Sequence, residues 1–210
     1  MLVSQRAEGG MSALTDLHKE ITDCRQCDLC RQRNRAVPGE GAEDAAIVFI
    51  GEAPGWHEDQ QGRPFVGSAG QFLDELLALI GMKRQEVYIC NVLKCRPPGN
   101  RDPLPIEIKT CQQWLERQLG LLRPDMIVTL GRYSMAKFFP GETISKIHGK
   151  ARREDGIIYY AMYHPAAALH QQNLRETIRA DMLKIPSLLA EAKPSPDTKA
   201  TEKPQQLSLL

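Results

Sequence analysis

The residues of this chain that are suited to chemistry follow short apolar runs. The motif Gly51-Glu52-Ala53-Pro54-Gly55 follows the first run. A second motif that begins and ends with glycine, Gly62 to Gly67, contains Phe65. Asn91 ends the next run, and His164-Pro165 follows the last one. If the runs are neighbouring parallel strands, ligands bind at their carboxyl ends. We therefore expect a carboxylate, an amide, an imidazole and an aromatic ring to converge on one rim.

The cysteines form a second group with chemical potential. The sequence has neither an apolar run of membrane-spanning length nor a secretory signal, so we expect a cytoplasmic protein, nucleoid-associated if the host is bacterial, with no membrane partner. Reducing conditions favour metal ligation over disulfides. A turn from Cys24 to Cys27, joined by Cys95 and Cys111, suits either tetrahedral zinc or a four-iron cluster. The spacing alone does not separate these two.

The elements that must position these residues alternate in type. Four apolar runs, rich in β-branched residues, predict strands over 45–50, 87–92, 126–130 and 157–163. Helical periodicity predicts helices over 11–23, 68–80, 105–122, 132 to just before Pro140, and 174–189. Nearly continuous apolar strands separated by helices are typical of a sheet covered on both faces. The predicted fold is a three-layer α/β/α domain around a central four-stranded parallel sheet.

Length and composition predict one domain with extensions. The 210 residues, 42% of them apolar, can bury one good-sized core. We expect an N-terminal helix and lead-in over 1–23, the main domain over 24–189, and a disordered tail over 190–210, where the composition turns polar and proline-rich. The 27 basic and 26 acidic residues give no overall attraction to a polyanion, so nucleic-acid contact would depend on a local patch.

Several motifs of this sequence together resemble those of the iron-sulfur uracil-DNA glycosylases, family 4 of the uracil-DNA glycosylase superfamily. The resemblance covers roughly 24–189. The motifs that carry it are Gly51 to Gly55 with Glu58-Asp59, Gly62 to Gly67 with Gln71-Phe72-Leu73, Asn91 with Lys94 to Pro98, and His164 to Leu169. It implies a monofunctional glycosylase that hydrolyses the uracil–deoxyribose bond and leaves an abasic site. It also implies a four-iron–four-sulfur cluster on Cys24, Cys27, Cys95 and Cys111, with Cys30 as an additional nearby thiol.

The resemblance assigns roles that agree with the chemistry of each residue type. A flipped base needs an aromatic platform and a hydrogen-bonding partner for its edge, which we assign to Phe65 and Asn91. His164 would stabilise charge that develops on uracil O2, and the Ala53 N–H would face the same oxygen. Glu52 would position water, support the sugar or exclude the thymine methyl group. Each residue also has a plain structural alternative, such as core packing for Phe65 or loop capping for Glu52.

Contacts with DNA are expected beyond the pocket. Leu169 would wedge into the gap left by the flipped nucleotide, and His170 with the basic segment 146–153 would approach phosphates, including Lys146 and Lys150. The alternative for that segment is a solvated basic face. Glu58 and Asp59 are expected to order the loop rather than to catalyse.

Two further expectations concern partners and rival functions. The terminal peptide Gln206–Leu210 resembles the short peptides by which bacterial repair proteins bind the replication sliding clamp, and we otherwise expect a monomer. A non-catalytic metal-containing DNA-binding module and an electron-transfer protein are the rival functions. The sequence has no flavin or nicotinamide fingerprint that would favour the latter.

Overall fold

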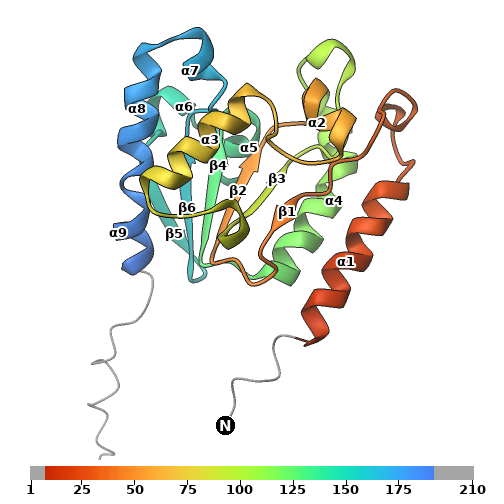
Figure 1. The fold of residues 1–210 in the computed structure, drawn as a ribbon, viewed down its shortest axis with the longest axis horizontal. Helices are drawn as coiled ribbons and strands as arrows, with labels where there is room; N and C mark the ends of the chain where they lie inside the picture. The colour runs from red at the N-terminus through yellow and green to blue at the C-terminus, as the bar shows by residue number, and fades with distance from the viewer. Residues whose placement is uncertain (1–7, 192–210) are drawn as a thin grey trace, which may run out of the picture.

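The computed structural model describes residues 8–191, with side chains from residue 13 onward. Its strands form one sheet in the order β1-β3-β2-β4-β6-β5 (Figure 1). The strands are β1 (Glu40–Gly41), β2 (Ile47–Gly51), β3 (Tyr88–Asn91), β4 (Met126–Leu130), β5 (Ala151–Glu154) and β6 (Ile157–Met162). The four central strands β3, β2, β4 and β6 are parallel, and β1 and β5 pair with them antiparallel at the two edges.

The predicted number of strands was wrong, because the two edge strands carry no apolar pattern. Strand β1 has two residues, and all four residues of β5, Ala-Arg-Arg-Glu, are exposed. Such edges are held by backbone hydrogen bonds to a single neighbour, so hydrophobic periodicity does not reveal them. The parallel core of four strands is confirmed, with β4 at its predicted residues and the other three shifted by at most two residues.

Each predicted helix is present, the last one in two pieces, and the structure adds three short helices that the sequence did not predict, over 56–61, 144–147 and 167–170. The helices are α1 (Glu8–Asp23), α2 (Trp56–Gln61), α3 (Ser68–Leu79), α4 (Pro105–Leu122), α5 (Arg132–Phe138), α6 (Ile144–Ile147), α7 (Ala167–His170), α8 (Asn173–Met182) and α9 (Ile185–Ala190). The helix predicted over 174–189 is two helices, α8 and α9, because Pro186 lacks the N–H needed inside a helix and stands in the first turn of α9. Within residues 8–191 no helix is long and apolar enough to cross a membrane.

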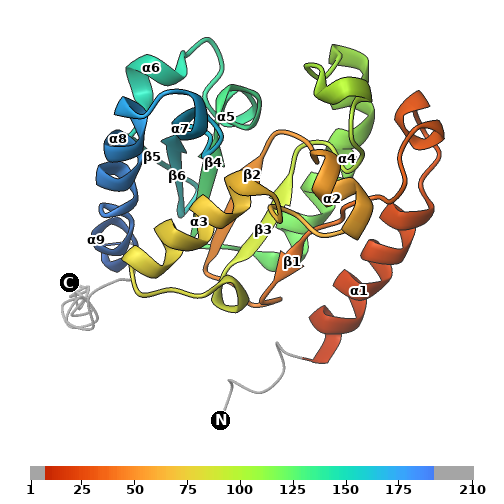
Figure 2. The ribbon, with the colours of Figure 1, turned by 45° about the horizontal axis from the view of Figure 1, so that its top comes forward.

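Different helices cover the two faces of the sheet. Helices α3, α8 and α9 lie on one face and α1 and α4 on the other (Figures 1 and 2). Along β2, Ile47 and Phe49 belong to the core under α3, whereas Val48 and Ile50 belong to the core under α4. This alternation is what a strand buried on both faces requires. The predicted three-layer arrangement is therefore confirmed.

The carboxyl ends of the parallel strands place the predicted residues along one edge. Gly51 at the end of β2 pairs in register with Asn91 at the end of β3. The Gly131 N–H, just after β4, donates to the Met162 carbonyl at the end of β6, two residues before His164. Beyond residue 191 the predicted tail and its Gln206–Leu210 peptide lie outside the described residues.

Candidate active site and cysteine cavity

Gly51 allows two side chains to meet at the end of β2. A Cβ atom added at this glycine would collide with Oδ1 of Asn91 and with the ring of Phe65. Only a residue without a side chain permits this approach. Two of the residues predicted to bind a base thus lie beside each other at the backbone of the first motif.

Asn91 presents an acceptor that has no partner. Its side chain is 2% exposed, and Oδ1 is buried without a hydrogen bond to any described group. Leaving such an atom unpaired costs about 1–3 kcal/mol, so buried amide oxygens are almost always bonded. A ligand that donates a hydrogen bond at this position would remove that cost.

His164 lies beside Phe65 and is held as a neutral ring. The two ring centroids are 5.5 Å apart with an interplanar angle of 24°. The Ala166 N–H donates to Nδ1 of His164 over 3.1 Å, which leaves the proton of a neutral imidazole on Nε2. Burial lowers the pKa of His164 to about 4, against a smaller opposing effect of the Glu58 charge. At neutral pH this histidine is therefore an uncharged hydrogen-bond donor.

Glu52 and Ala53 follow Gly51 on the same rim. Burial raises the pKa of the Glu52 carboxyl, and the charge of Asp102 raises it further, while Arg132 opposes both. Within residues 8–191 the Glu52 carboxylate accepts no hydrogen bond, so it does not cap the loop. The Ala53 N–H likewise donates to no described acceptor. Both groups thus have no hydrogen-bond partner among the described residues.

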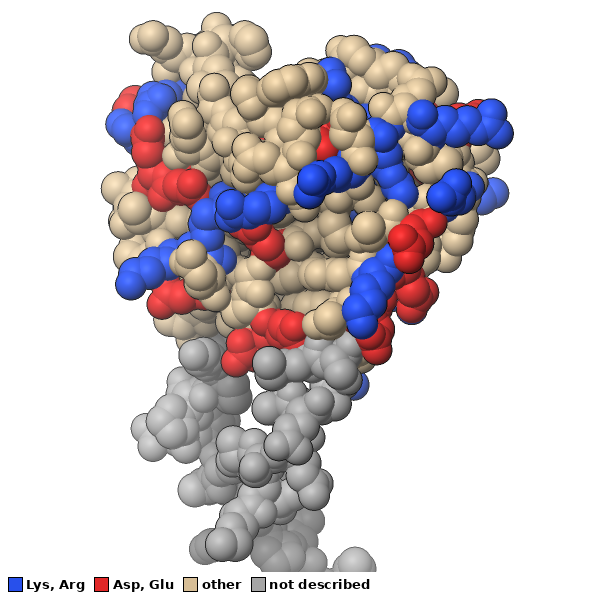
Figure 3. Space-filling model, turned by 45° about the vertical axis from the view of Figure 1, so that its right-hand side comes forward, with Lys and Arg blue, Asp and Glu red and all other residues tan. Residues whose placement is uncertain are grey.

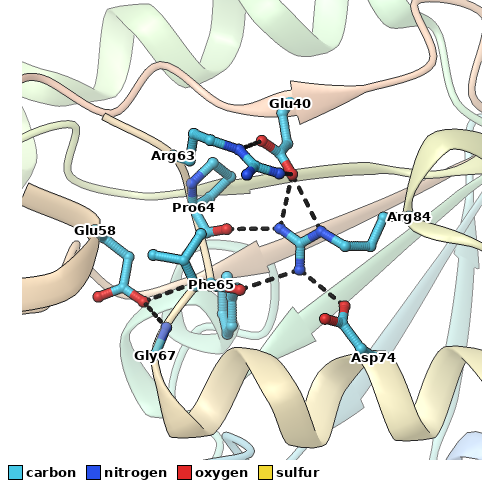
Figure 4. A network of polar contacts seen from close by, with 9 residues as sticks. Glu40, Glu58, Arg63, Pro64, Phe65, Gly67, Asp74 and Arg84 are labelled. Carbon is cyan, nitrogen blue, oxygen red and sulfur yellow. Dashed lines mark hydrogen bonds and ion pairs between the residues drawn. The ribbon is translucent and has the colours of Figure 1, made fainter. Parts of the chain in front are cut away.

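An acidic side chain orders the loop that carries Phe65. Oε1 of Glu58 accepts hydrogen bonds from the backbone N–H groups of Val66 and Gly67, both over 2.9 Å (Figure 4). Asp59 is 1% exposed and accepts two hydrogen bonds from Asn34. Glu58 therefore orders the Phe65 loop as predicted, whereas Asp59 is bonded to a different segment, at Asn34.

Arg84 contacts the same loop, and sequence analysis missed it. Its guanidinium donates to the carbonyls of Pro64 and Phe65 over 2.6 and 3.1 Å. It also pairs with the carboxylates of Glu40 and Asp74, both at 2.9 Å (Figure 4). Arg84 stands in a short 3-10 turn between predicted elements, where an arginine gives no sequence pattern that indicates a functional site.

The second region brings the predicted metal ligands together. One cavity is lined by Cys24, Cys27, Cys95 and Cys111, and Cys30 lines it as well. In the described part of the chain, no three His, Cys, Asp or Glu side chains converge as closely as a single metal ion requires. The four cysteines therefore share one cavity.

Hydrogen-bond donors point at two of these sulfurs. The Arg33 guanidinium donates to Sγ of Cys95 over 2.9 Å, and the Lys94 N–H donates to Sγ of Cys111 over 3.3 Å. Burial raises the pKa of Cys111 to about 12, and it also raises that of Cys95. Buried thiols of this kind lose their protons when a cation takes the proton's place.

Lys94 is a buried cation without an anionic partner among the described residues. Its side chain is 1% exposed and also lines the cysteine cavity. Nζ donates to the Asn91 carbonyl over 2.8 Å and to Oε1 of Gln118 over 2.6 Å, and both acceptors are neutral. Burying an ammonium ion without a counter-charge costs several kcal/mol. Sequence analysis missed this role, because the position of a lysine in the sequence does not reveal its burial.

The basic segment 146–153 is only partly available for phosphate contact. Lys146 and Lys150 are exposed and form no ion pair within the described residues. Three other side chains of the segment have acidic partners: His148 contacts Asp181, Arg152 pairs with Glu154, and Arg153 pairs with Glu191. On the face drawn in Figure 3, basic and acidic side chains are interspersed.

Leu169 lies where an apolar side chain meets solvent. It is 45% exposed in the short helix α7, which begins three residues after His164. His170, the last residue of α7, is also exposed. The structure thus places the predicted wedge residue beside the rim.

Comparison with known proteins gives concordant results. The family model described as the uracil DNA glycosylase superfamily matches residues 38–184. A type-4 uracil-DNA glycosylase of Archaeoglobus fulgidus is 47% identical over 88% of this chain and 98% of its own length. Type-4 uracil-DNA glycosylases of Sulfurisphaera tokodaii and Thermotoga maritima are 45% and 40% identical, over 85% and 81% of this chain and 86% and 92% of their own lengths.

Proposed function

The chain belongs to the uracil-DNA glycosylase superfamily, and on that premise we propose that it excises uracil from DNA. The enzyme hydrolyses the bond between uracil and deoxyribose, which yields free uracil and an abasic site. One observation carries the assignment to this pocket: the buried, unpartnered Oδ1 of Asn91 beside the Phe65 ring.

Asn91 distinguishes uracil from cytosine by the direction of its hydrogen bonds. Oδ1 accepts the N–H of the uracil ring, and the side-chain NH₂ donates to uracil O4. Cytosine presents an acceptor and a donor in the opposite arrangement, so both bonds would fail. A two-bond pairing of this type contributes about 1–3 kcal/mol of discrimination.

His164 promotes departure of the base. The uracil is flipped out of the DNA and stacks on Phe65. As the glycosidic bond breaks, negative charge grows on uracil O2, and the Nε2–H of neutral His164 donates to that oxygen together with the Ala53 N–H. Glu52 positions the attacking water, and its raised pKa makes it a better proton acceptor than an ordinary glutamate.

We further propose that Cys24, Cys27, Cys95 and Cys111 hold a four-iron–four-sulfur cluster, with Cys30 as an extra thiol on the same cavity. The choice of this cluster over tetrahedral zinc rests on the similarity to the type-4 uracil-DNA glycosylases, since four thiols suit either group. A cluster held by thiolates is anionic, and the nearby Lys94 and Arg33 cations match that charge.

When bound, the cluster supplies a cross-link that ties the turn after α1 to the segment after Asn91. The residues that hold it thereby support the wall of the base pocket, and no electron-transfer step is required for hydrolysis.

DNA outside the pocket is held by Leu169, Lys146 and Lys150. Leu169 fills the space of the flipped nucleotide, and the two lysines approach phosphates. The Gln206–Leu210 peptide would bind a replication sliding clamp. A pull-down in which removal of these five residues left clamp binding unchanged would contradict that part of the proposal.

The glycosylase activity is tested with oligonucleotides that contain one uracil. The purified protein is incubated with single- and double-stranded forms, followed by alkaline cleavage at abasic sites. We expect strand scission at uracil and none when cytosine replaces it. No scission at uracil would contradict the proposal and favour a non-catalytic DNA-binding module.

A further inference from the structure

Phe65 has a backbone conformation that its own side chain disfavours. Its φ angle is 51°, in the left-handed region that glycine and asparagine adopt most readily. Aromatic residues persist there only where the surrounding structure imposes it, and such positions gather at functional sites. The conformation therefore requires contacts that hold the backbone of this loop.

Two side chains of opposite charge bind the backbone of this loop, one at its carbonyl groups and the other at its N–H groups. Arg84 donates to the carbonyls of Pro64 and Phe65, and Glu58 accepts from the next two N–H groups, those of Val66 and Gly67 (Figure 4). Four consecutive residues are thus fixed by a cation on the carbonyl side and an anion on the amide side.

The guanidinium of Arg84 is itself fully fixed. Nη1 bonds the Phe65 carbonyl and Asp74, Nη2 bonds the Pro64 carbonyl and Glu40, and Nε bonds Glu40. These contacts use all five N–H donors of an arginine. The side chain is 15% exposed, so the carboxylates of Glu40 and Asp74 keep it in one orientation with little competition from water.

Helix α3 limits the loop from the other side. A Cβ atom added at Gly70 would collide with the carbonyl carbon and oxygen of Phe65. The backbone of Phe65 is therefore confined between α3 and the Arg84 guanidinium. Both contacts are made to the backbone of Phe65 and not to its ring.

We infer that Arg84 is a positioning residue for uracil excision, which acts by holding Phe65 in its left-handed conformation. This inference rests on the proposed function. Without Arg84, the carbonyls of Pro64 and Phe65 lose their donors, the backbone relaxes, and the ring leaves the orientation required for stacking. Arg84 itself does not contact the base.

A double-mutant cycle tests this inference with Arg84→Gln, Phe65→Ala and the combined variant. The measured quantities are the single-turnover excision rate at excess enzyme and the affinity for free uracil. We expect Arg84→Gln alone to lower the rate by about 10- to 100-fold, since small displacements of a binding surface have effects of this size. In the Phe65→Ala background the same change is expected to alter the rate less than about twofold, because the ring is already absent.

Arg63→Gln is the matched control. Arg63 pairs with the same Glu40, at 2.7 Å, but is 58% exposed and does not bind the Phe65 carbonyl. We expect it to change the rate less than about twofold. Arg84→Lys, which keeps the charge with fewer donors, should lie between wild type and Arg84→Gln, and it serves if the glutamine variant does not fold.

An equal loss in both backgrounds would overturn the inference, because Arg84 would then act independently of the ring. So would an unchanged affinity of Arg84→Gln for free uracil. If the wild-type protein excised no uracil, the proposed function would fail instead, and the two failures are therefore distinguishable.

Discussion

The base pocket and the cysteine cavity differ in the charge of the polar groups that no described residue fully satisfies: the pocket has neutral groups without a hydrogen-bond partner, and the cavity has cations whose acceptors carry no negative charge. In the pocket these groups are neutral: the Oδ1 acceptor of Asn91 and the Nε2–H donor of His164. In the cavity they are cationic, with Lys94 and Arg33 beside thiols. A neutral hydrogen-bonding ligand satisfies the first region, and only an anionic group balances the second.

On the proposed function, this difference matches a pocket that exchanges its base and a cavity that would retain its cluster. A neutral base leaves the pocket at the cost of a few hydrogen bonds, whereas loss of an anionic group would leave a buried ammonium ion unbalanced. The two regions nevertheless share a wall, because Lys94 donates to the carbonyl of Asn91.

The largest expected effect separates the two regions by activity. His164→Ala removes the donor to uracil O2 and should lower the single-turnover excision rate by about 10²–10³-fold. The iron content of this variant and the visible absorbance of its proposed cluster should not change, because His164 does not line the cysteine cavity. A variant that excised uracil at the wild-type rate would remove His164 from the mechanism.

The second-largest expected effect distinguishes the base pocket from the cysteine cavity by the metal content of variants. Cys95→Ser should abolish the visible absorbance and lower the free energy of unfolding by on the order of 3 kcal/mol, because a ligand of the cross-linking group is lost. Cys30→Ser is the matched control and should keep both iron and stability. The opposite pattern in these two variants would assign Cys30, rather than Cys95, to the cluster.

A smaller effect tests the buried cation. Lys94→Met preserves the side chain's length but removes its charge, so iron release to a chelator should accelerate about tenfold. Lys109→Met, at an exposed position of α4, should release iron at the wild-type rate. Equal rates for both variants would show that the cavity does not need its positive charge.

The smallest effect is an absence of pH dependence. Since the pKa of His164 is lowered to about 4, its neutral form persists, and the excision rate should not change through His164 between about pH 5 and pH 8. The unfolded chain protonates this histidine below about pH 6.5, so its contribution to stability falls as pH drops from there towards 4. A rate that rose as pH fell through about 6.5 would instead indicate a charged His164.

Sequence patterns predicted the buried parallel strands and the residues that follow their carboxyl ends. The four parallel strands are apolar because both of their faces are covered, and their common edge explains why Gly51, Asn91 and His164 lie along the same rim. Arg84 and Lys94 escaped prediction because each acts through backbone carbonyls, and an acceptor of that kind is present at every residue.

The basic segment 146–153 shows a case in which the sequence predicted more available basic side chains than the structure has. Its sequence predicts one phosphate-binding cluster, but partners from α8, from the end of α9 and from β5 itself engage His148, Arg153 and Arg152. The partners of His148 and Arg153 lie more than 30 residues away in the chain, so they depend on the fold and no local pattern encodes them.

The most direct test of the central claim, that the unpartnered acceptor of Asn91 exists to bind uracil, is the excision rate of Asn91→Leu measured alongside its stability. Leucine has a similar shape and removes the unpaired oxygen. We predict an excision rate lower by about 10- to 100-fold, with a free energy of unfolding equal to or above that of the wild type. Wild-type excision by Asn91→Leu would contradict the account.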